Sequence, residues 1–370
     1  MTVWFYAPMK SPASPKPSGD RTFARLLMSV LEPLGGVHLA SECISWLRTP
    51  DTNEMTRVRT EAAVEVERIL QTPAELAPHA WVTYPNYYRA PDLIGPAVAD
   101  QFGIPYLMIE ASYARKRDHD AWAPWQAEAI TAFRRADVIL PVTERDRLGL
   151  EELGLQADVL MTLPPFLDVA AFRSAPRSSP PTDDRPLALL VVAMMREGAK
   201  RRSYAFLADA LRQLPDKNWT LDIVGDGSAR TAIETDFAFA EAQQVRWRGA
   251  LPTQAVATLM READLFVWPG FDEAFGMAYL EAQAVGLPVI ALATAGVPSV
   301  VRHGQSGVLV DGADPQRFAQ VIADLGRNAE TRDRLSNAAL QYVETHHSIE
   351  TASRTLEAAL NRATIRRRQR

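Results

Sequence analysis

The chain has little of what marks several large protein classes. Its 370 residues include a single cysteine, Cys43, which forms no disulfide within the chain and suits a reducing compartment. No run approaches the ~20 apolar residues of a membrane-spanning helix, and the first residues lack the basic region and long apolar core of a signal peptide. A formal net charge of −5 argues against a nucleic-acid-binding protein, which usually has a strongly basic face. We therefore expect a cytoplasmic protein that binds no nucleic acid, with peripheral membrane contact left open.

What is present is an ordinary globular composition with a regular alternation of strands and helices. With 47% hydrophobic and 23% charged residues the chain is typical of soluble folded proteins, and its length exceeds the ~100–200 residues of one domain. Short apolar strands alternate with helical patterns, which implies parallel sheets with helices on both faces. The expected strands are 3–6, 37–40, 81–84, 105–109, 138–141, 187–192, 219–224, 245–247, 265–268 and 289–291, and the clearest helices are 20–34 and 125–136.

A stretch rich in proline and serine divides this pattern. Residues 173–186 contain four prolines and three serines, which make a poor helix or strand and a good linker. We expect an α/β protein with a Rossmann-like domain at 1–172, the linker, and a second Rossmann-like domain at 187–348. Two doubly wound domains of this kind would face an interdomain cleft, where ligands bind at the carboxyl ends of the strands. The basic tail, 366–370, is expected to be frayed and solvated, with contact to anionic lipid as the alternative.

The richest segment, from Trp268 to Ile290, indicates a strand, a loop, a helix, a Gly-Leu-Pro turn and another strand. Gly276 at the helix start lets the backbone come close to a ligand, and the first N–H groups with the helix dipole suit a phosphate. Glu273 precedes the helix, and Glu281 lies ~7.5 Å beyond Gly276 at ~1.5 Å per residue. Because a carboxylate can accept from two vicinal hydroxyls, a sugar fits at one end of the phosphate site and a ribose at the other. The N–H groups are those of Phe275, Gly276 and Met277.

This segment resembles the family-4 retaining glycosyltransferases of the GT-B fold (glycosyl transferases group 1). Their pattern Glu-x-Phe-Gly-x-x-x-x-Glu-Ala, followed by Gly-x-Pro-Val, is present from Glu273 to Val289, and the resemblance covers essentially all of 187–360. It implies transfer of a hexose from a nucleoside-diphosphate sugar to an acceptor hydroxyl with retention, in polysaccharide or glycan biosynthesis. The implied acceptor is a carbohydrate, a lipid-linked molecule or a small molecule, and no metal or cofactor is required. Further matching segments are 223–228, 248–250, 263–267 and 296–310.

The resemblance also assigns roles to individual residues. Glu281 would hold the ribose, and Glu273 the donor sugar. Arg196 and Lys200 map to the family's basic pair, with Arg201 as a competing choice for the lysine. Their charges would stabilise the diphosphate as the sugar–phosphate bond breaks.

Two glycines are weaker candidates for the donor site. Family members often have a glycine pair after the first strand, whereas this chain has only Gly19, at a helix start that Ser18 or Asp20 would cap. An ordinary capped loop is the alternative. Gly225 follows a strand in Gly-Asp-Gly, and a tight turn is the alternative there. In the family the last helix, here 349–370, crosses back to the first domain.

One acidic motif and one histidine pair bear on metal binding. Asp118-His-Asp120 has the spacing of the metal motif of other sugar transferases, but it lies in the first domain, away from the inferred phosphate site. We therefore expect no metal site. His346 and His347 do not share a helix face, so a surface or interdomain pair is expected.

Acceptor binding falls to the first domain, where the resemblance is weaker. Glu110 ends a strand where relatives commonly place a histidine close to the reacting sugar carbon. It would orient a sugar hydroxyl or receive the acceptor's proton; the alternative is that it pairs with Arg115, Lys116 or Arg117 and only shapes the loop. Aromatic rings beside basic groups suit sugar stacking or an anionic acceptor, although packing is nearly as favoured for each ring. The acceptor candidates are Asn86, Tyr87, Tyr88, Tyr113, Lys116 and Trp122.

Rival functions fit the same pattern. A nucleotide-sugar epimerase or hydrolase of this fold would release free nucleotide without an acceptor. A phosphorylase would need a cofactor-bearing lysine environment, which the sequence does not show. A non-catalytic nucleotide-sugar-binding subunit is the rival from another class, and the pair of glutamates argues against it.

Overall fold

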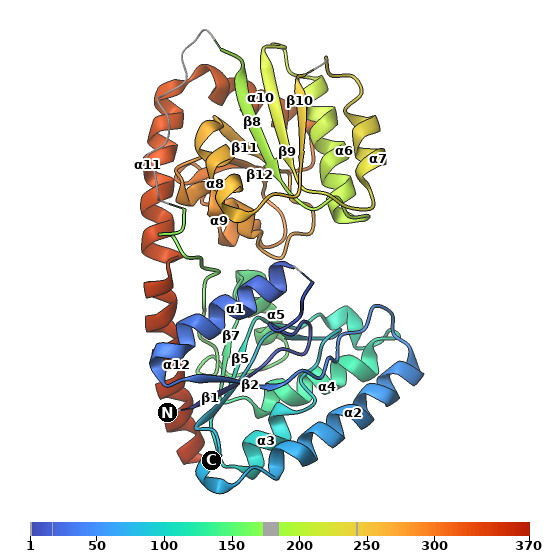
Figure 1. Cartoon of the computed structure of the whole chain (residues 1–370), viewed down its shortest axis with the longest axis vertical. Helices are drawn as coiled ribbons and strands as arrows, with labels where there is room; N and C mark the ends of the chain where they lie inside the picture. Colours follow the sequence, from blue (N-terminus) through green and yellow to red (C-terminus); the bar gives the residue numbers. More distant parts are fainter. Residues whose placement is uncertain (1, 17, 173–184, 242) are drawn as a thin grey trace. The chain divides into compact units, whose positions relative to one another are not determined.

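The computed structural model divides the chain into two compact units (Figure 1). Unit 1 comprises Met1–Pro164 and Glu350–Arg370, and unit 2 comprises Pro165–Ile349. The predicted linker lies outside the described residues, apart from Arg185 and Pro186. The described residues are 2–16, 18–172, 185–241 and 243–370.

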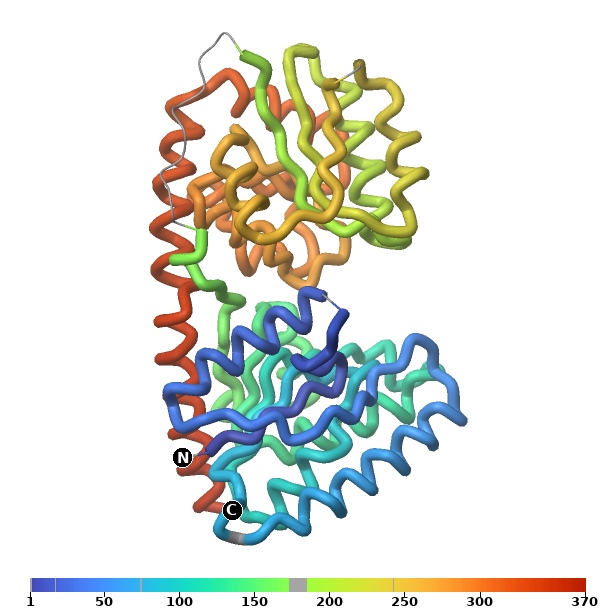
Figure 2. The backbone as a smooth tube through the Cα atoms, viewed as in Figure 1, coloured from blue at the N-terminus to red at the C-terminus, as the bar shows by residue number. Residues whose placement is uncertain are grey.

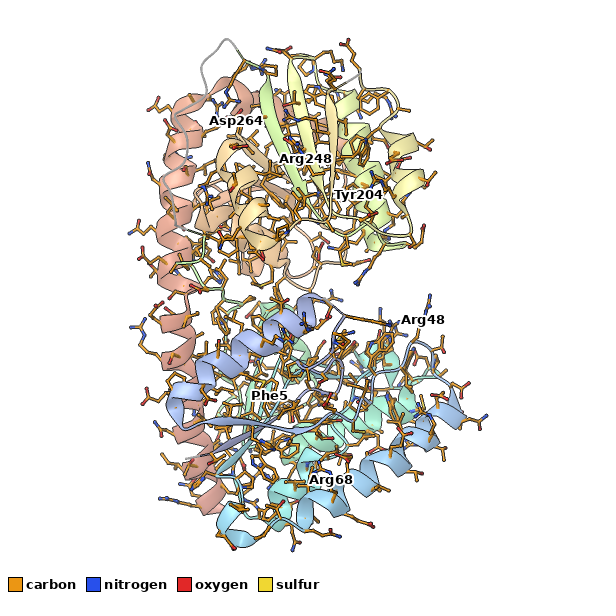
Figure 3. The ribbon with its side chains drawn as sticks, viewed as in Figure 1. Phe5, Arg48, Arg68, Tyr204, Arg248 and Asp264 are labelled. Carbon is orange, nitrogen blue, oxygen red and sulfur yellow. The ribbon has the colours of Figure 1, made fainter. Side chains whose placement is uncertain are left out.

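Unit 1 is built on a parallel five-stranded sheet in the order β2-β1-β3-β5-β7. Counted within the unit the order is 2-1-3-4-5, which is the doubly wound order of flavodoxin-like folds. The central strands are apolar and buried, as parallel strands between two helix layers must be; Phe5 in β1 is fully buried (Figure 3). The order reverses between β1 and β3, so the ligand crevice of such a sheet lies at their carboxyl ends. The strands are β1 (Val3–Tyr6), β2 (Val37–Ser41), β3 (Ala80–Thr83), β5 (Tyr106–Ile109) and β7 (Val138–Leu140), with a separate pair β4 (Asn86–Tyr87) and β6 (Ala111–Ser112).

Side-chain caps fix where several helices of unit 1 begin. Ser18, Asp51 and Thr143 each accept a hydrogen bond from a first-turn backbone N–H, and such a cap is worth ~1 kcal/mol. Ser18 rather than Asp20 therefore caps the first helix. The helices are α1 (Gly19–Leu31), α2 (Thr52–Leu70), α3 (Gly95–Gln101), α4 (Ala123–Arg135), α5 (Glu144–Glu152) and α12 (Ile349–Gln369).

Unit 2 is built on a parallel six-stranded sheet in the order β10-β9-β8-β11-β12-β13. Counted within the unit this is 3-2-1-4-5-6, the Rossmann order, which reverses between β8 and β11. The packing is close: Tyr204, in the first helix of the unit, is buried and donates a hydrogen bond of 2.7 Å to the carbonyl of Ala193, just after β8 (Figure 3). The strands are β8 (Leu187–Val192), β9 (Trp219–Val224), β10 (Val245–Gly249), β11 (Leu265–Val267), β12 (Val289–Leu292) and β13 (Gly307–Val310). The helices are α6 (Ala199–Arg212), α7 (Arg230–Asp236), α8 (Thr253–Glu262), α9 (Met277–Ala284), α10 (Pro315–Arg327) and α11 (Ala329–His346).

The last helix, α12, belongs almost wholly to unit 1, so both ends of the chain lie in that unit (Figure 2). Its basic end is ordered. Arg366 forms an ion pair with Asp158, and Arg370 forms one of 3.3 Å with the buried Asp137. The expectation of a frayed, solvated tail is therefore wrong, because carboxylates of unit 1 hold these arginines. None of the described helices is both long and apolar enough to cross a membrane.

Residues 165–172 pack within unit 2, although the sequence placed them at the end of the first domain. Leu167 donates its N–H to the carbonyl of His347 at 3.0 Å, and Arg261 donates to the carbonyl of Phe172 at 3.2 Å. These contacts move the boundary of the unit from 172 to Pro164.

Candidate active site

The predicted donor residues of unit 2 follow the two strands between which the sheet order reverses. Arg196 and Lys200 follow β8, and Glu273 follows β11. Connections that leave neighbouring strands in opposite directions open a crevice at the carboxyl ends of those strands. The sheet topology therefore gathers residues that are more than seventy positions apart in the sequence.

Lys200, Glu273 and Trp268 form one cluster beyond the carboxyl ends of β8 and β11. The Nζ of Lys200 forms an ion pair with the Oε1 of Glu273 and lies 5.5 Å from the centroid of the Trp268 ring. The Nε1 of Trp268 donates to the same carboxylate oxygen at 2.9 Å. The side chain of Glu273 is 13% exposed and that of Lys200 is 31% exposed, so the pair is accessible to a ligand yet partly shielded from water.

The structure distinguishes Lys200 from Arg201 as the basic residue beside Glu273. Arg201 binds Asp236 of α7, with one hydrogen bond of 2.9 Å, and so faces away from Glu273. Arg196 is exposed, and within the described parts of the chain no ion pair or side-chain hydrogen bond involves it. Its guanidinium is therefore available to a ligand.

The start of α9 depends on glycine. Gly276 has a left-handed backbone (φ 83°), and a Cβ there would lie 2.6 Å from the ring of Tyr279. Tyr279 is fully buried and donates a hydrogen bond of 3.0 Å to the carbonyl of Trp268. This packing brings the helix start close to the Lys200 cluster. The first N–H groups of a helix have no partner within it, so those of Gly276 and Met277 are oriented for an anion.

Glu281 lies in the second turn of α9 and is partly exposed. Burial raises the pKa of its carboxyl from 4.5 to about 7. No hydrogen bond or ion pair within the described part of the chain satisfies this side chain. A carboxylate that is partly shielded from water can accept hydrogen bonds from the hydroxyls of a ligand.

Gly225 has a reason to be glycine that involves no ligand. It has φ 140°, and a Cβ there would overlap the carbonyl of Ala193 in the loop after β8. The two loops are also joined by a hydrogen bond of 3.0 Å from Met195 N to Asp226 O. The tight turn of the sequence analysis therefore explains this glycine, and a donor contact stays a prediction.

In unit 1, Glu110 follows β5 with an unusual backbone. Its φ is 54°, and its N–H donates to the carbonyl of Leu140 at 3.0 Å. Its Oε2 is buried and has no hydrogen-bond partner among the described residues. Burial, followed by the charges of Asp20 and Asp146, raises the pKa of this carboxyl to about 8, although a hydrogen bond from Tyr84 opposes the shift. A non-glycine residue held in this region of φ costs roughly 1–3 kcal/mol and commonly marks a functional position.

The alternative role for Glu110, pairing with the basic loop that follows, is not what the structure shows. Arg115 forms its ion pair with Glu152 at 3.1 Å, and Arg117 forms its pair with Asp120 at 2.6 Å. No ion pair of the described residues includes Glu110. The loop is thus held by other carboxylates, and that hypothesis is wrong.

Comparison with known proteins identifies the second unit. Residues 182–342 match the family model described as glycosyl transferases group 1, and this span takes in all six strands of the unit 2 sheet and the Lys200 cluster. This region of the chain is similar to the group 1 glycosyl transferases. The resemblance read from the sequence is confirmed.

The chain is similar to D-inositol 3-phosphate glycosyltransferases. It is 28% identical to the one from Thermobispora bispora over 312 residues, which cover 78% of this chain and 72% of that protein. With the one from Corynebacterium glutamicum it shares 33% identity over 144 residues, which cover 38% of this chain and 34% of that protein.

Solved structures show the fold of the whole chain. HepE from Anabaena in complex with UDP aligns with a TM-score of 0.76 at 17% identity, covering 98% of this chain and 100% of that one. Sucrose-phosphate synthase from Thermosynechococcus elongatus aligns with a TM-score of 0.73 at 17% identity, covering 97% and 98%. The predicted GT-B fold with two Rossmann-like domains is confirmed. That the two domains face a common cleft stays a prediction.

One predicted acceptor residue of the transferase is structural. Asn86 is fully buried; its side-chain amide donates to the carbonyl of Ala129 at 3.2 Å and accepts from the N–H of Asp92 at 2.8 Å. It holds a loop to the core and has no surface for a ligand, which corrects the expected role.

The aromatic candidates are largely engaged in packing. Trp122 is 5% exposed and belongs to a satellite core, and its ring is covered by the guanidinium of Arg89 at 5.3 Å. Tyr88 packs edge-on against Trp122, and Arg117 lies 4.6 Å from the Tyr88 centroid. Because these faces already carry cations and rings, a sugar-stacking role for Trp122 and Tyr88 is not supported. Tyr87 remains a candidate, since it is half-buried; its ring meets Tyr88 edge-on at 5.6 Å and its hydroxyl contacts the Sδ of Met9 at 3.5 Å.

The loop from Tyr113 to Trp122 is stabilised by the two aspartates that resembled a metal motif. Asp118 accepts hydrogen bonds from the hydroxyl of Tyr113 and from Gln126, and Asp120 pairs with Arg117. Tyr113 therefore shapes the loop, whereas Lys116 is exposed and remains an acceptor candidate.

Two remaining residues have simple structural settings. A Cβ at Gly19 would meet no atom within 4 Å, so the fold itself does not require glycine there and a close ligand approach stays a prediction. His347 is buried and hydrogen-bonds through Nδ1 to the carbonyl of Pro165 at 2.6 Å, while burial lowers its pKa to about 4. His347 thus belongs to the packing of unit 2, whereas His346 is exposed and stacks on the ring of Tyr342.

Sequence reasoning gave no role to three residues that the structure places in the candidate sites. Trp268 and Tyr279 lie inside the motif and fix Glu273 and Gly276, and Tyr84 reaches Glu110. Trp268 and Tyr84 each follow the last residue of a strand directly. Since carboxyl ends of strands face the crevice, that position was the available signal.

Proposed function

We propose that this glycosyltransferase moves a hexose from a nucleoside-diphosphate sugar to an acceptor hydroxyl, with retention and without a metal. The bond from the anomeric carbon to a phosphate oxygen breaks, a bond from that carbon to the acceptor oxygen forms, and the acceptor's proton is released. The observation that carries the proposal is the contact of Lys200 with Glu273 and Trp268 at the reversal point of the sheet. A cation for the leaving diphosphate and a carboxylate for sugar hydroxyls are there in one cluster.

The contacts suggest which residue would bind each part of the sugar donor. Both contacts of Glu273 reach Oε1, so we assign Oε2 to the hydroxyls of the donor sugar. Lys200 and the exposed Arg196 would stabilise the diphosphate as its charge grows. The N–H groups at the start of α9 would bind a phosphate oxygen, and Glu281 would accept from the ribose.

On the acceptor side we propose Glu110. With a pKa of about 8 its carboxyl is largely protonated at pH 7 in the ligand-free protein, so there it orients a hydroxyl, and it receives a proton only once ionised. The relatives are named for D-inositol 3-phosphate, and the exposed Lys116 offers a cation for an anionic acceptor of that kind. A cytoplasmic location rests on the sequence alone and stays a prediction.

The test supplies a panel of nucleotide-sugars with D-inositol 3-phosphate, inositol and simple sugars as acceptors. Free nucleoside diphosphate is measured, and the anomeric configuration of the product is read by proton NMR. Lys200→Ala should lower kcat about 10²–10³-fold. Arg202→Ala is the matched control, because Arg202 lies on the same helix but pairs with the exposed Asp272, and its activity should hardly change.

Three results would contradict the proposal. An inverted product would exclude retention. Equal activity of the Lys200 and Arg202 variants would remove the basic residue from the mechanism. Release of nucleotide at the same rate with and without every acceptor would identify a hydrolase or epimerase instead.

A further inference from the structure

The guanidinium of Arg89, in the loop after β4 of unit 1, belongs to a partly buried side chain. Within the described part of the chain no ion pair or side-chain hydrogen bond involves it. Its Nε is buried without a partner, whereas its two terminal nitrogens keep accessible surface. A guanidinium has five N–H donors and a permanent positive charge. A ligand that reaches these nitrogens would therefore meet unused donors and a charge that no carboxylate balances.

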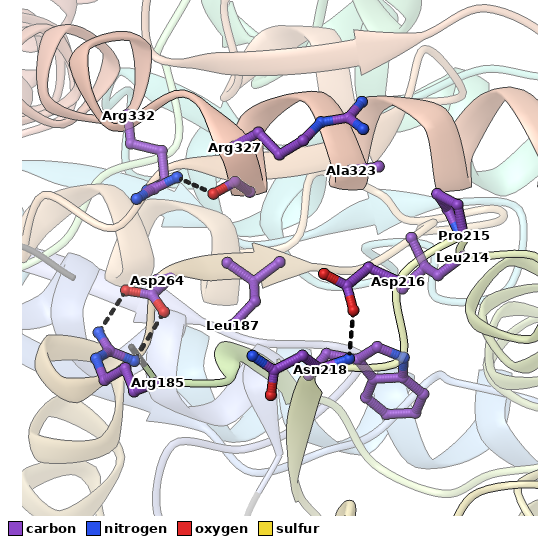
Figure 4. A pocket seen from close by; sticks show the side chains of 12 residues that line it. Arg185, Leu187, Leu214, Pro215, Asp216, Asn218, Asp264, Ala323, Arg327 and Arg332 are labelled. Carbon is purple, nitrogen blue, oxygen red and sulfur yellow. Dashed lines mark hydrogen bonds and ion pairs between the residues drawn. The ribbon is translucent and has the colours of Figure 1, made fainter. Parts of the chain in front are cut away.

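The arginines of a recess in unit 2 are, by contrast, already engaged (Figure 4). There Arg185 binds both carboxylate oxygens of Asp264, at 2.7 and 2.9 Å. Arg327 and Arg332, which also line the recess, bind a carboxylate and two backbone carbonyls respectively. An anion would have to displace these partners, whereas Arg89 can bind one without losing a contact of this kind.

Two aromatic rings and the backbone hold Arg89 in place. Its guanidinium carbon lies 5.3 Å from the centroid of the Trp122 ring and 5.6 Å from that of Tyr88. These rings pack edge-on against each other, with their centroids 5.3 Å apart. The carbonyl of Arg89 accepts a hydrogen bond of 2.9 Å from the N–H of Leu47, in the loop after β2. A guanidinium held in this way loses less side-chain entropy when it binds an anion.

The carboxylates of the neighbouring loop do not neutralise Arg89. Arg117, whose guanidinium carbon lies 4.6 Å from the centroid of Tyr88, pairs with Asp120 at 2.6 Å. Asp118 accepts hydrogen bonds from a tyrosine hydroxyl and a glutamine amide instead. Two guanidiniums therefore lie against the Tyr88 ring, and only one of them has a carboxylate partner. The excess positive charge favours an anionic ligand.

The loop that carries Arg89 lies beside Glu110. Strand β4 pairs with β6, which begins one residue after Glu110, and the N–H of Asn86 donates to the carbonyl of Glu110 at 3.3 Å. Burial raises the pKa of the Tyr87 hydroxyl; among the smaller causes, the charge of Arg89 lowers this pKa and that of Glu110 raises it. Both groups are therefore close enough to act on the same hydroxyl.

We propose that Arg89 binds a phosphate monoester on the acceptor while Glu110 meets the acceptor's reacting hydroxyl. A guanidinium donates two parallel hydrogen bonds to a phosphate. Because Arg89 and Glu110 are close to one tyrosine hydroxyl, the acceptor is a small ring that carries both groups. D-Inositol 3-phosphate, after which the relatives are named, belongs to this class. The reacting hydroxyl rests on the proposed function, whereas phosphate binding can be measured without turnover.

Calorimetry with D-inositol 3-phosphate and inositol as probes measures what the phosphate contributes. Arg89→Met keeps an apolar stem over the rings but removes the donors and the charge. It should bind D-inositol 3-phosphate about 10–100-fold more weakly than the unchanged protein, the range expected for a hydrogen bond to a charged group. Arg59→Met is the matched control, because Arg59 lies 5.1 Å from the ring centroid of Trp125 but pairs with Glu128 at 2.8 Å. Its affinity for the phosphate should be unchanged.

Steady-state kinetics and a conservative variant complete the test. In Arg89→Met the ratio of kcat/KM for D-inositol 3-phosphate to that for inositol should fall about 10–100-fold. The change should lie in the KM of the phosphorylated acceptor, because the contact is equally strong before and during the reaction. Arg89→Lys keeps the charge and the stem but loses the paired donors, so its affinity should lie between those of Arg89→Met and the unchanged protein. This comparison remains available if Arg89→Met folds poorly.

Several results would overturn the proposal. One is equal affinity of the variants of Arg89 and the unchanged protein for D-inositol 3-phosphate, and another is an equal loss of affinity for inositol, which would mean that only packing was disturbed. A loss of UDP affinity in Arg89→Met would assign the guanidinium to the donor. Failure of the proposed function looks different: no acceptor receives a sugar, yet D-inositol 3-phosphate still binds through Arg89, and the phosphate site stands.

Discussion

The two units differ in how far their candidate sites are assembled by their own contacts. In unit 2 an ion pair, an indole hydrogen bond and a ring contact already join Lys200, Glu273 and Trp268. In unit 1 the corresponding carboxyl, Glu110, has a buried oxygen without a partner and a strained backbone. On the proposed function, the diphosphate would meet groups that are already in contact within one unit, whereas the acceptor would meet a carboxyl with one buried oxygen that its own unit leaves without a partner.

The largest expected effect is a loss of stability on replacing a glycine of unit 2, compared with the same change in unit 1. Gly225→Ala should lower the free energy of unfolding by more than ~3 kcal/mol, because φ is 140° and the new Cβ would overlap a carbonyl. Gly19→Ala should change it by less than ~1 kcal/mol, because the position is helical and open. Urea unfolding of both variants measures this. Equal losses would mean that unit 1 is packed at Gly19 as tightly as unit 2 is at Gly225.

Glu110→Gln tests whether the unsatisfied carboxyl of unit 1 works in the reaction. The variant keeps the shape and removes the charge, so kcat should fall ~10²–10⁴-fold while donor affinity is preserved. Steady-state kinetics per folded molecule is the measurement. A variant with nearly normal turnover would exclude Glu110 from the reaction.

The same variant has a second readout in the pH dependence of stability. The pKa of Glu110 is raised from 4.5 to about 8 in the folded protein, so folding holds a proton that the unfolded chain releases. The contribution of Glu110 to stability is fully present below pH ~4.5 and is lost as the pH rises toward ~8. The melting temperature of Glu110→Gln relative to the unchanged protein should therefore rise across this window. A flat difference would show that the pKa of Glu110 is not raised by folding.

Glu281 offers a smaller effect on the donor side. Loss of a charged acceptor for the ribose should weaken nucleotide binding by ~1.5–3 kcal/mol, or ~10–100-fold. Because the pKa is about 7, the affinity of the unchanged protein should increase as the pH rises through 7, and that of Glu281→Ala should not. Calorimetry with UDP and GDP measures both, with Glu262→Ala at the exposed end of α8 as control. Equal affinity of Glu281→Ala and the unchanged protein would remove the ribose assignment.

The smallest expected effect is that of metal removal. Exhaustive EDTA treatment should leave activity unchanged, because in the proposed mechanism Lys200 and Arg196 of unit 2 supply the cations for the diphosphate. The assay of nucleotide release described above is sufficient. Activity that disappears and returns with Mg²⁺ or Mn²⁺ would shift the chemistry to Asp118 and Asp120 of unit 1.

The strands of both sheets could be predicted from local sequence patterns. All ten predicted strands are present, with ends displaced by at most two residues, because short apolar runs between helices have few other structures available. Three described strands were not predicted: the pair β4 and β6, and β13 (Gly307–Val310) at the edge of its sheet. β4 and β6 are only two residues long, which is too short for a recognisable apolar pattern.

The site could be predicted only where one helix start determines it. Spacing alone placed Glu273, Gly276 and Glu281 around α9. Consecutive residues of an α-helix point in directions about 100° apart, so the choice between Lys200 and Arg201 required the orientation of α6 about its axis. Lys200 faces Glu273, and Arg201 faces Asp236. The burial of Asn86 and Trp122 was beyond reach, because their partners lie far away in the sequence.

The return of α12 to unit 1 has a consequence for synthesis on the ribosome. Unit 2 is complete once Ile349 has emerged, whereas unit 1 begins first and lacks its final helix until the last residues appear. At ~5–20 residues per second, the nascent unit 1 waits for tens of seconds while unit 2 is made. During that interval the surface that α12 will cover is open to chaperones, and Asp137 is without Arg370. A stop codon that removes only Glu350–Arg370 would leave unit 2 whole, and unit 1 would permanently lack its last helix.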